Sequence, residues 1–284
     1  FGSRLPTTGG TALGAGASSV SFSQQATGLT ADTDYYYCAI AQSAEGTSFG
    51  AIASFRTSTA PVTTTTAATS VTPTSATLNG VGNPKGATTT GWFRYSSTQP
   101  ASCSDSFGAR APTSGGSSLG ATPVDVSFSR SISGLSPGTR YWFCAISSNA
   151  YGTTFGAVLA FDTPPTVPVV QTGFAISITG TGATLTGTVT PGGAATTGWY
   201  RYDTVSPGTC NDTFGTRAPT SGGVALPAGN AVVDLIQAAT GLSPNTTYYV
   251  CAIAENTAGK AVGSVVSFVT PQPPTVVTNA ASSI

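Results

Sequence analysis

Hydrophobic and polar residues alternate along most of the chain, in short runs that end at clusters of Gly, Pro, Asn and Ser. An alternation with period two is typical of strands with one buried face, and no stretch sustains the period of a helix. In the middle of the chain the pattern predicts strands over Ser75–Val81, Thr90–Ser96, Val124–Ile132, Arg140–Ser147 and Thr153–Phe161. The predicted fold class is therefore all-β, with antiparallel sheets.

Two motifs recur along the chain with one spacing. The segment Phe-Gly-x-Arg-x-Pro-Thr begins at Phe1, Phe107 and Phe214, so the copies are 106 and 107 residues apart. The triplet Cys-Ala-Ile also occurs three times at these two offsets. A repeat of about 100 residues is too long for a solenoid unit and is typical of a β-sandwich domain.

The repeats predict the domain organisation. We expect residues 1–60 to be the C-terminal part of a first sandwich repeat, 61–164 a second complete repeat, 165–271 a third complete repeat, and 272–284 the opening strand of a fourth. Stretches rich in Pro and Thr lie between them, at Thr57–Thr66, Asp162–Pro168 and Thr270–Thr275. Such stretches favour extended conformations, so we expect them to be spacers.

The five cysteines follow the same repeat. Cys103 and Cys144 are 41 residues apart, and so are Cys210 and Cys251. We interpret each pair as a disulfide within one repeat, which leaves Cys38 unpaired because its partner would precede residue 1. A zinc site is the alternative, but two thiolates per repeat without histidine do not supply four ligands. Disulfides indicate an oxidising compartment, outside the cell or at its surface.

Composition narrows the function. Only 7% of the residues are charged, and ten Lys plus Arg balance ten Asp plus Glu, so we expect no binding to nucleic acid. Histidine, the commonest general base and metal ligand, is absent from the sequence, so we expect no metal, no cofactor and no enzymatic activity. The match to Gly-x-Ser-x-Gly at Ser48 lacks the strand-to-helix context of a hydrolase and is interpreted as a hairpin turn. No apolar run reaches the ~20 residues of a membrane span, so no membrane insertion of this segment is expected.

Several segments resemble the fibronectin type III-like repeats of bacterial extracellular proteins, which are immunoglobulin-like β-sandwiches. In the middle repeat they are Ser75–Pro84, Trp92–Tyr95, Gly134–Tyr141 and Ala150–Gly156. In the third repeat they are Gly182–Pro191, Trp199–Tyr202 and Gly241–Tyr248. The Tyr-rich stretch before Cys38 is also similar to antibody variable domains, but Trp92 precedes both cysteines of its repeat, which does not fit their order of Cys, Trp, Cys.

The resemblance implies that Tyr141 faces the core. Alternation then turns Trp142 and Cys144 outward, and the resemblance likewise turns Trp92 and Arg94 outward. We therefore expect the disulfide to lie on the outer face of the sheet, where it would hold the Gly-rich insertion that begins at Cys103 and form a second small core.

The predicted contact surface consists of these outward side chains and their counterparts: Trp92, Arg94, Trp142, Trp199, Arg201 and Tyr249. Three interpretations remain open: the surface is covered within its own repeat, with Arg stacked on Trp; it packs against another repeat or chain; or it stacks on a sugar ring. Five further charged residues recur between copies: Arg4, Arg110, Arg217, Asp105 and Asp212. They either contact a carboxylate or a sugar, or brace the insertion.

These features favour a structural or adhesive repeat region of a secreted or surface-displayed bacterial protein, such as a stalk or a filament subunit. Its expected partners are further copies of itself or neighbouring repeats, because chains with near-zero net charge associate readily. The alternative is a carbohydrate-binding or spacer module of a secreted polysaccharide-active enzyme, with glycans as the ligand.

Overall fold

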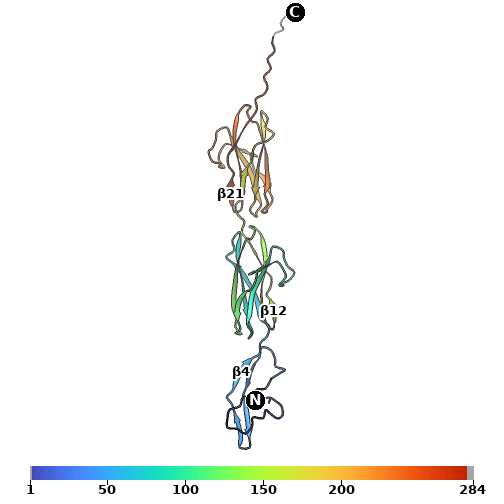
Figure 1. Cartoon of the computed structure of the whole chain (residues 1–284). Helices are drawn as coiled ribbons and strands as arrows, with labels where there is room; N and C mark the ends of the chain where they lie inside the picture. Colours follow the sequence, from blue (N-terminus) through green and yellow to red (C-terminus); the bar gives the residue numbers. More distant parts are fainter. Residues whose placement is uncertain (1, 280–284) are drawn as a thin grey trace. The chain divides into compact units, whose positions relative to one another are not determined.

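The computed structural model describes residues 2–279 (Figure 1). Every regular element in this range is a β-strand, so the range contains no helix that could cross a membrane. All strand pairs whose register is known are antiparallel. The all-β, antiparallel fold class predicted from the alternation is thus confirmed.

Residues 2–60 form two small sheets of two strands each. Strands β1 (Asp34–Tyr37) and β4 (Ala53–Arg56) make one sheet, and β2 (Ile40–Ser43) and β3 (Gly46–Phe49) make the other. Ser48 lies in strand β3 of the β2–β3 hairpin, opposite Ala41, so the predicted hairpin is present but this residue is not in its turn. None of residues 2–60 is buried, and Cys38 is a half-buried free thiol. Tyr37, for example, is 55% exposed, whereas its counterpart Phe143 in the next repeat is 0% exposed.

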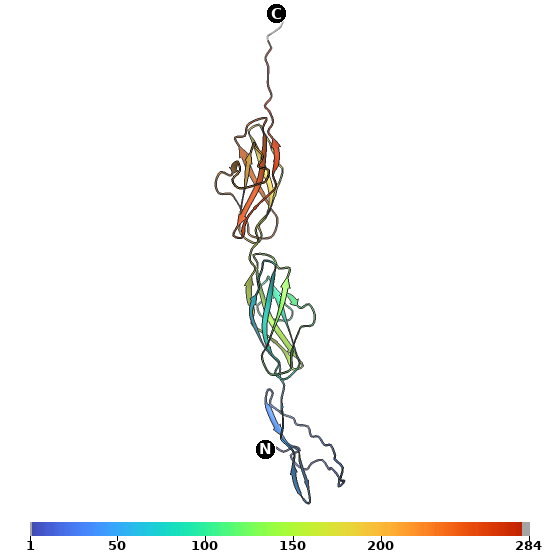
Figure 2. The ribbon, with the colours of Figure 1, turned by 90° about the vertical axis from the view of Figure 1, so that its left-hand side faces the viewer.

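The middle sandwich packs two antiparallel sheets against each other (Figures 1 and 2). Its smaller sheet has the order β10-β6-β5, with β5 Val62–Thr69, β6 Ser75–Asn83 and β10 Val126–Ser133. Its larger sheet has the order β12-β11-β7-β8, with β7 Thr89–Ser96, β8 Ala109–Ala111, β11 Arg140–Asn149 and β12 Gly152–Phe155. Two more strands join it: β9 (Ser117–Gly120) pairs with β7, and β13 (Leu159–Asp162) pairs with β11.

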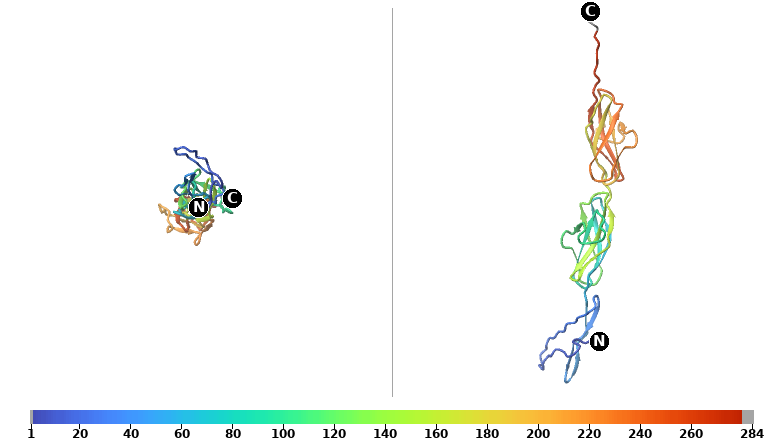
Figure 3. Two further views of the ribbon diagram at one scale, coloured as in Figure 1. Left: turned by 90° about the horizontal axis from the view of Figure 1, so that it is seen from below. Right: turned by 90° about the vertical axis from the view of Figure 1, so that its right-hand side faces the viewer.

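The third sandwich repeats this arrangement (Figure 3). Its smaller sheet has the order β14-β15-β19, with β14 Val169–Thr172, β15 Gly182–Thr190 and β19 Val233–Thr240. Its larger sheet has the order β17-β16-β20-β21, with β16 Thr196–Asp203, β17 Thr216–Ala218, β20 Thr247–Asn256 and β21 Gly259–Val262. Strand β18 (Val224–Leu226) pairs with β16, and β22 (Val266–Val269) pairs with β20.

The two sandwiches fill the same part of the core with different side chains. In the middle sandwich the Phe128 ring lies over Gly91, where an added Cβ would come within 2.9 Å of the ring. In the third sandwich Leu235 stands at the position of Phe128, and Tyr200 stands at that of Phe93. The fully buried Tyr200 hydroxyl donates a hydrogen bond to the Leu235 carbonyl at 2.6 Å, which satisfies its polar group. Burial also raises the pKa of Tyr200.

The single strand predicted over Thr153–Phe161 is wrong, because the chain forms β12 and β13 with a break between them. The break begins at Gly156, whose N–H donates to the Ala145 carbonyl. Thr65 of the opposite sheet reaches the same place, and its Oγ1 accepts the Ala145 N–H at 3.0 Å. An added Cβ on Gly156 would lie 2.4 Å from this oxygen. A side chain from the other sheet therefore interrupts the ladder, which period-two reasoning does not anticipate.

Two further predictions differ from the structure. Residues 62–66 belong to strand β5, and not to the spacer assigned to Thr57–Thr66, because this Thr-rich stretch packs on the sandwich. The Gly-rich insertion contains strands β8 and β9, which were not predicted.

The end of the chain leaves one prediction partly outside the described range. From Thr270 to Asn279 the described residues contain no strand, and the remainder of the proposed opening strand, residues 280–284, lies outside the described residues. The boundaries of the repeats stay predictions.

Candidate functional site

Each sandwich has one disulfide on the outer side of its larger sheet. Cys103 bonds to Cys144, and Cys210 bonds to Cys251, with Cα atoms 6.0 and 5.9 Å apart. Cys144 and Cys251 are fully buried in the sheet, on β11 and β20. The predicted pairing within each repeat is therefore confirmed. We call residues 103–120 and 210–226, which begin at the outer cysteine, the flaps.

The disulfide and a tryptophan share one face of the sheet. In the pairing of β7 with β11, Arg94 lies opposite Cys144 and Trp92 lies opposite Ile146, so these side chains are neighbours on the outer face. Trp92 is only 7% exposed and packs with Cys144 and Ile146, and Cys103 and two half-buried residues pack against this cluster. The expected second small core beneath the flap is thus present in the middle sandwich.

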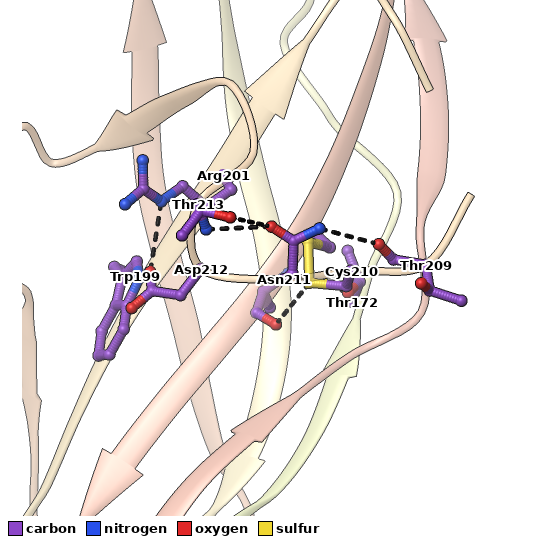
Figure 4. Close-up of a disulfide and its surroundings, with 10 residues drawn as sticks. Thr172, Trp199, Arg201, Thr209, Cys210, Asn211, Asp212 and Thr213 are labelled. Carbon is purple, nitrogen blue, oxygen red and sulfur yellow. Dashed lines mark hydrogen bonds and ion pairs between the residues drawn. A yellow bond between two sulfur atoms is a disulfide. The ribbon is translucent and has the colours of Figure 1, made fainter. Parts of the chain in front are cut away.

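An aspartate of the flap binds the indole N–H. Asp105 Oδ1 accepts hydrogen bonds from Trp92 Nε1 at 2.7 Å and from Arg94 Nε at 3.0 Å. In the third sandwich Asp212 accepts from Trp199 Nε1 at 2.8 Å and from Arg201 Nε at 3.3 Å (Figure 4). One carboxylate therefore satisfies the polar atom of a buried indole and neutralises an adjacent guanidinium.

A second arginine covers the indole ring. The Arg110 guanidinium carbon lies 4.7 Å from the centre of the Trp92 ring, and that of Arg217 lies 4.6 Å from the centre of the Trp199 ring. Strand β8 pairs with β7 so that Arg110 lies opposite Arg94, which makes Trp92 its diagonal neighbour. An arginine does stack on Trp92, as one of the three interpretations holds, but it is Arg110 of the flap, because the outward Arg94 binds Asp105 instead.

The stacked arginines also close their own loops. Arg110 donates to the carbonyl oxygens of Pro112 and Gly115, and Arg217 donates to those of Pro219 and Gly222. Arg4 makes the same type of contact with the carbonyls of Thr7 and Gly9. Bracing of the insertion, one of the two sequence-based interpretations, therefore describes what these arginines do within the chain.

The third sandwich adds a lysine to this arrangement. Lys260 Nζ lies 2.6 Å from Asp212 Oδ2, 3.7 Å from Glu255 Oε2 and 5.3 Å from the centre of the Trp199 ring. In the middle sandwich Ser148 and Thr153 stand at the positions of Glu255 and Lys260 and hydrogen-bond to each other at 2.7 Å.

The lysine changes the protonation equilibrium of the aspartate. Burial acts to raise the pKa of Asp212, but the hydrogen bonds from Lys260, Trp199 and Arg201 outweigh it and lower that pKa below its ordinary value. The hydrogen bond to Asp212 in turn raises the pKa of Lys260. Both groups are therefore held in their charged forms.

The six residues of the predicted contact surface differ in how far they are buried. Trp92 and Trp199 are 7% and 4% exposed, so their rings are covered within their own sandwich. Trp142 and Tyr249 are half-buried, and the register places them opposite Ser96 and Asp203.

A shallow, open depression of about 560 Å³ lies beside Trp199. Its lining includes Trp199, Asp212, Arg217, Glu255 and Asn256. The two carboxylates bind Lys260, and Arg217 and Asn256 donate to backbone carbonyls, so its charged groups are already engaged. Over the described part of the chain, no three His, Cys, Asp or Glu side chains gather as a group that could hold a metal ion.

Comparisons with known proteins assign no family to this chain, although some solved structures are similar to it. No protein-family model matches the chain, and no curated protein matches its sequence. Among solved structures, the FN1–FN3 domains of chicken CNTN1 are similar, at 15% identity, over 86% of this chain and 78% of that chain, with a TM-score of 0.25. The sensor domain of the anti-sigma factor RsgI4 from Pseudobacteroides cellulosolvens is similar at 20% identity, over 37% of this chain and 89% of that chain, with a TM-score of 0.24. At TM-scores this low neither similarity bears on activity, and the fold assignment rests on the chain's own sheets and registers.

Proposed function

We propose that the chain is a structural repeat region of a secreted or surface-displayed bacterial protein, of the stalk or filament type. Its sandwiches serve as load-bearing units and have no catalytic role. The two disulfides support an oxidising location, and the tandem repeat supports a chain that is lengthened by adding equivalent units.

One observation carries this proposal: the recurrent polar residues of the flaps bind their own sandwich. Asp105 and Asp212 bind the indoles, and Arg110 and Arg217 cover them. Side chains that recur between repeats and face a ligand would support a binding role, whereas these support a module stabilised from within.

The alternative, a carbohydrate-binding module, has less support. Sugar recognition by stacking needs an exposed aromatic face, and Trp92 and Trp199 are covered. We therefore propose neighbouring repeats or further copies of the chain as the partners, in preference to glycans.

A single-molecule stretching experiment tests the proposal. Each disulfide joins two cysteines that are 41 residues apart, so the chain between them can be stretched only after the bond is cut. We expect two discrete unfolding steps from the two sandwiches, and reduction should lengthen each step by about 140 Å at about 3.5 Å per residue. The control is the same chain with the two cysteines of one sandwich replaced by serine. In this variant the unfolding step of that sandwich should already have the longer extension before any reductant is added. Extension without discrete resistance would contradict a load-bearing role.

A further inference from the structure

The sheet edges of the two sandwiches are unequal in length. The outer strands of the larger sheets are broken into pieces of three or four residues: β8, β9, β12 and β13 in the middle sandwich, and β17, β18, β21 and β22 in the third. Short edge strands resist pairing with another chain. Strand β14, at one edge of the third sandwich's smaller sheet, has only four residues as well.

Strand β19, at the other edge of this sheet, is eight residues long, and among the described strands only β15 pairs with it. The neighbouring contacts show which of its backbone groups face outward. Thr184 of β15 exchanges both of its backbone hydrogen bonds with Ile176, so the even-numbered residues of β15 bond away from β19. The odd-numbered residues therefore bond to β19, where Leu185 lies opposite Gln237. It follows that the even-numbered residues of β19 direct their N–H and C=O groups to the open edge.

These outward positions differ between the two sandwiches. In β19 they are Asp234, Ile236, Ala238 and Thr240. In the equivalent strand β10 they are Ser127, Ser129, Ser131 and Ser133. The exposed Arg130 is not an outward-bonding position, but it lies between two of them in the middle of the strand. A charged side chain in the middle of an edge strand opposes pairing, whereas β19 has an exposed Ile236 near its centre and one charge near its end.

We propose that β19 is a docking edge for β19 of a second copy of this chain, the two strands running antiparallel. This inference rests on the proposed structural function and gives it a specific route of self-association. In the register that uses all four outward positions, Ile236 of each copy lies opposite Ala238 of the other, and Asp234 lies opposite Thr240. The four pairs would form eight backbone hydrogen bonds across the new edge. The Ala238 carbonyl accepts a hydrogen bond from Gln237 Nε2 at 3.1 Å within the chain and keeps a second lone pair for the bond to the other copy.

Charge favours a second copy as the occupant. The two Asp234 carboxylates would stand at opposite ends of the paired strands, about 20 Å apart at about 3.3 Å per residue, so they would not repel each other strongly. The chain as a whole has a net charge of zero, which removes long-range repulsion between copies. The pairing would also cover Ile236, which is 55% exposed.

The test uses the substitution Ala238→Pro in the full chain. Ala238 directs its N–H to the open edge, so proline removes a hydrogen bond that a second copy would use and none that β15 uses. The matched control is Ser131→Pro, at the same position of β10. Analytical ultracentrifugation over a range of concentrations measures the dimer, and thermal unfolding verifies that each variant is folded.

We expect the unmodified chain and the Ser131→Pro variant to dimerise with the same affinity, and Ala238→Pro to weaken the dimer at least about tenfold. Ile236→Lys, which keeps the backbone intact and adds a charge to the edge, should weaken it as well. A chain that stays monomeric at high concentration would overturn the inference. So would equal dimerisation of Ala238→Pro and the unmodified chain, because association would then use another surface, such as the exposed side chains of residues 2–60. Neither result would affect the stretching experiment, so failure of the docking edge is distinguishable from failure of the structural role.

Discussion

Replacing Cys210 and Cys251 together by serine is expected to lower the unfolding free energy of the third sandwich by about 3 to 4 kcal/mol. The bond closes a loop of 41 residues, and on the chain-entropy model its loss releases that much conformational entropy in the unfolded state. This is a large part of the ~5–15 kcal/mol that stabilises a typical domain. Differential scanning calorimetry should show one of the two sandwich transitions moving to lower temperature.

The middle sandwich serves as an internal control for this experiment, because its Cys103–Cys144 bond is unchanged. Both cysteines are replaced because a single remaining cysteine would be a second free thiol besides Cys38, and its thiolate can attack the intact Cys103–Cys144 disulfide and exchange with it. The disulfide would have no stabilising role if both transitions stayed at their original temperatures.

The substitution Trp199→Ala should lower the unfolding free energy of the third sandwich by about 3 to 5 kcal/mol, the usual loss for a buried aromatic residue. The cavity would lie beside the disulfide, and Asp212 would lose its hydrogen bond from the indole. Arg217 and Lys260 would lose the ring that they cover. Chemical denaturation followed by circular dichroism measures the change.

Tyr249→Ala is the matched control for this variant. Tyr249 lies in the same sandwich, on β20 next to Cys251, but it is only half-buried. We expect Tyr249→Ala to lower the unfolding free energy by about 1 kcal/mol or less, because Tyr249 buries less apolar surface than Trp199. Equal losses from the two variants would argue against a second core beneath the flap.

Much of the fold follows from local patterns in the sequence. Strand β6 begins at Ser75 as predicted and ends two residues beyond the predicted Val81. Ala76 and Leu78 face the core while their neighbours in sequence are less buried, which is the period-two pattern itself. The disulfides follow from the repeat, since a shared separation of 41 residues identifies Cys103 with Cys144 and Cys210 with Cys251.

The contacts of the flap could not be predicted in the same way. Recurrence singled out Arg110 and Asp105, but their partners depend on how β8 folds back beside β7, which is a long-range contact. With β8 missing from the prediction, Arg94 was the nearest cation to Trp92 in the sequence. The structure instead places Arg110 over the ring and Arg94 on Asp105.

The break between β12 and β13 has a similar origin. It depends on Thr65, a residue 91 positions away from Gly156 that bonds to the sheet from the opposite side. Neither Gly156 nor Thr65 is unusual in its local segment, so the break between the two strands could not be predicted from the local sequence and depends on their contact in the folded chain.

Acrylamide quenching of tryptophan fluorescence measures whether the flaps cover the indole rings of Trp92 and Trp199. The variant Trp142→Phe leaves these two as the only tryptophans of the chain. We expect blue-shifted emission, quenching several-fold weaker than for free tryptophan, and no change on adding glycans. Emission near that of free tryptophan, with equally strong quenching in the oxidised protein, would show that the flaps leave the two indole rings exposed.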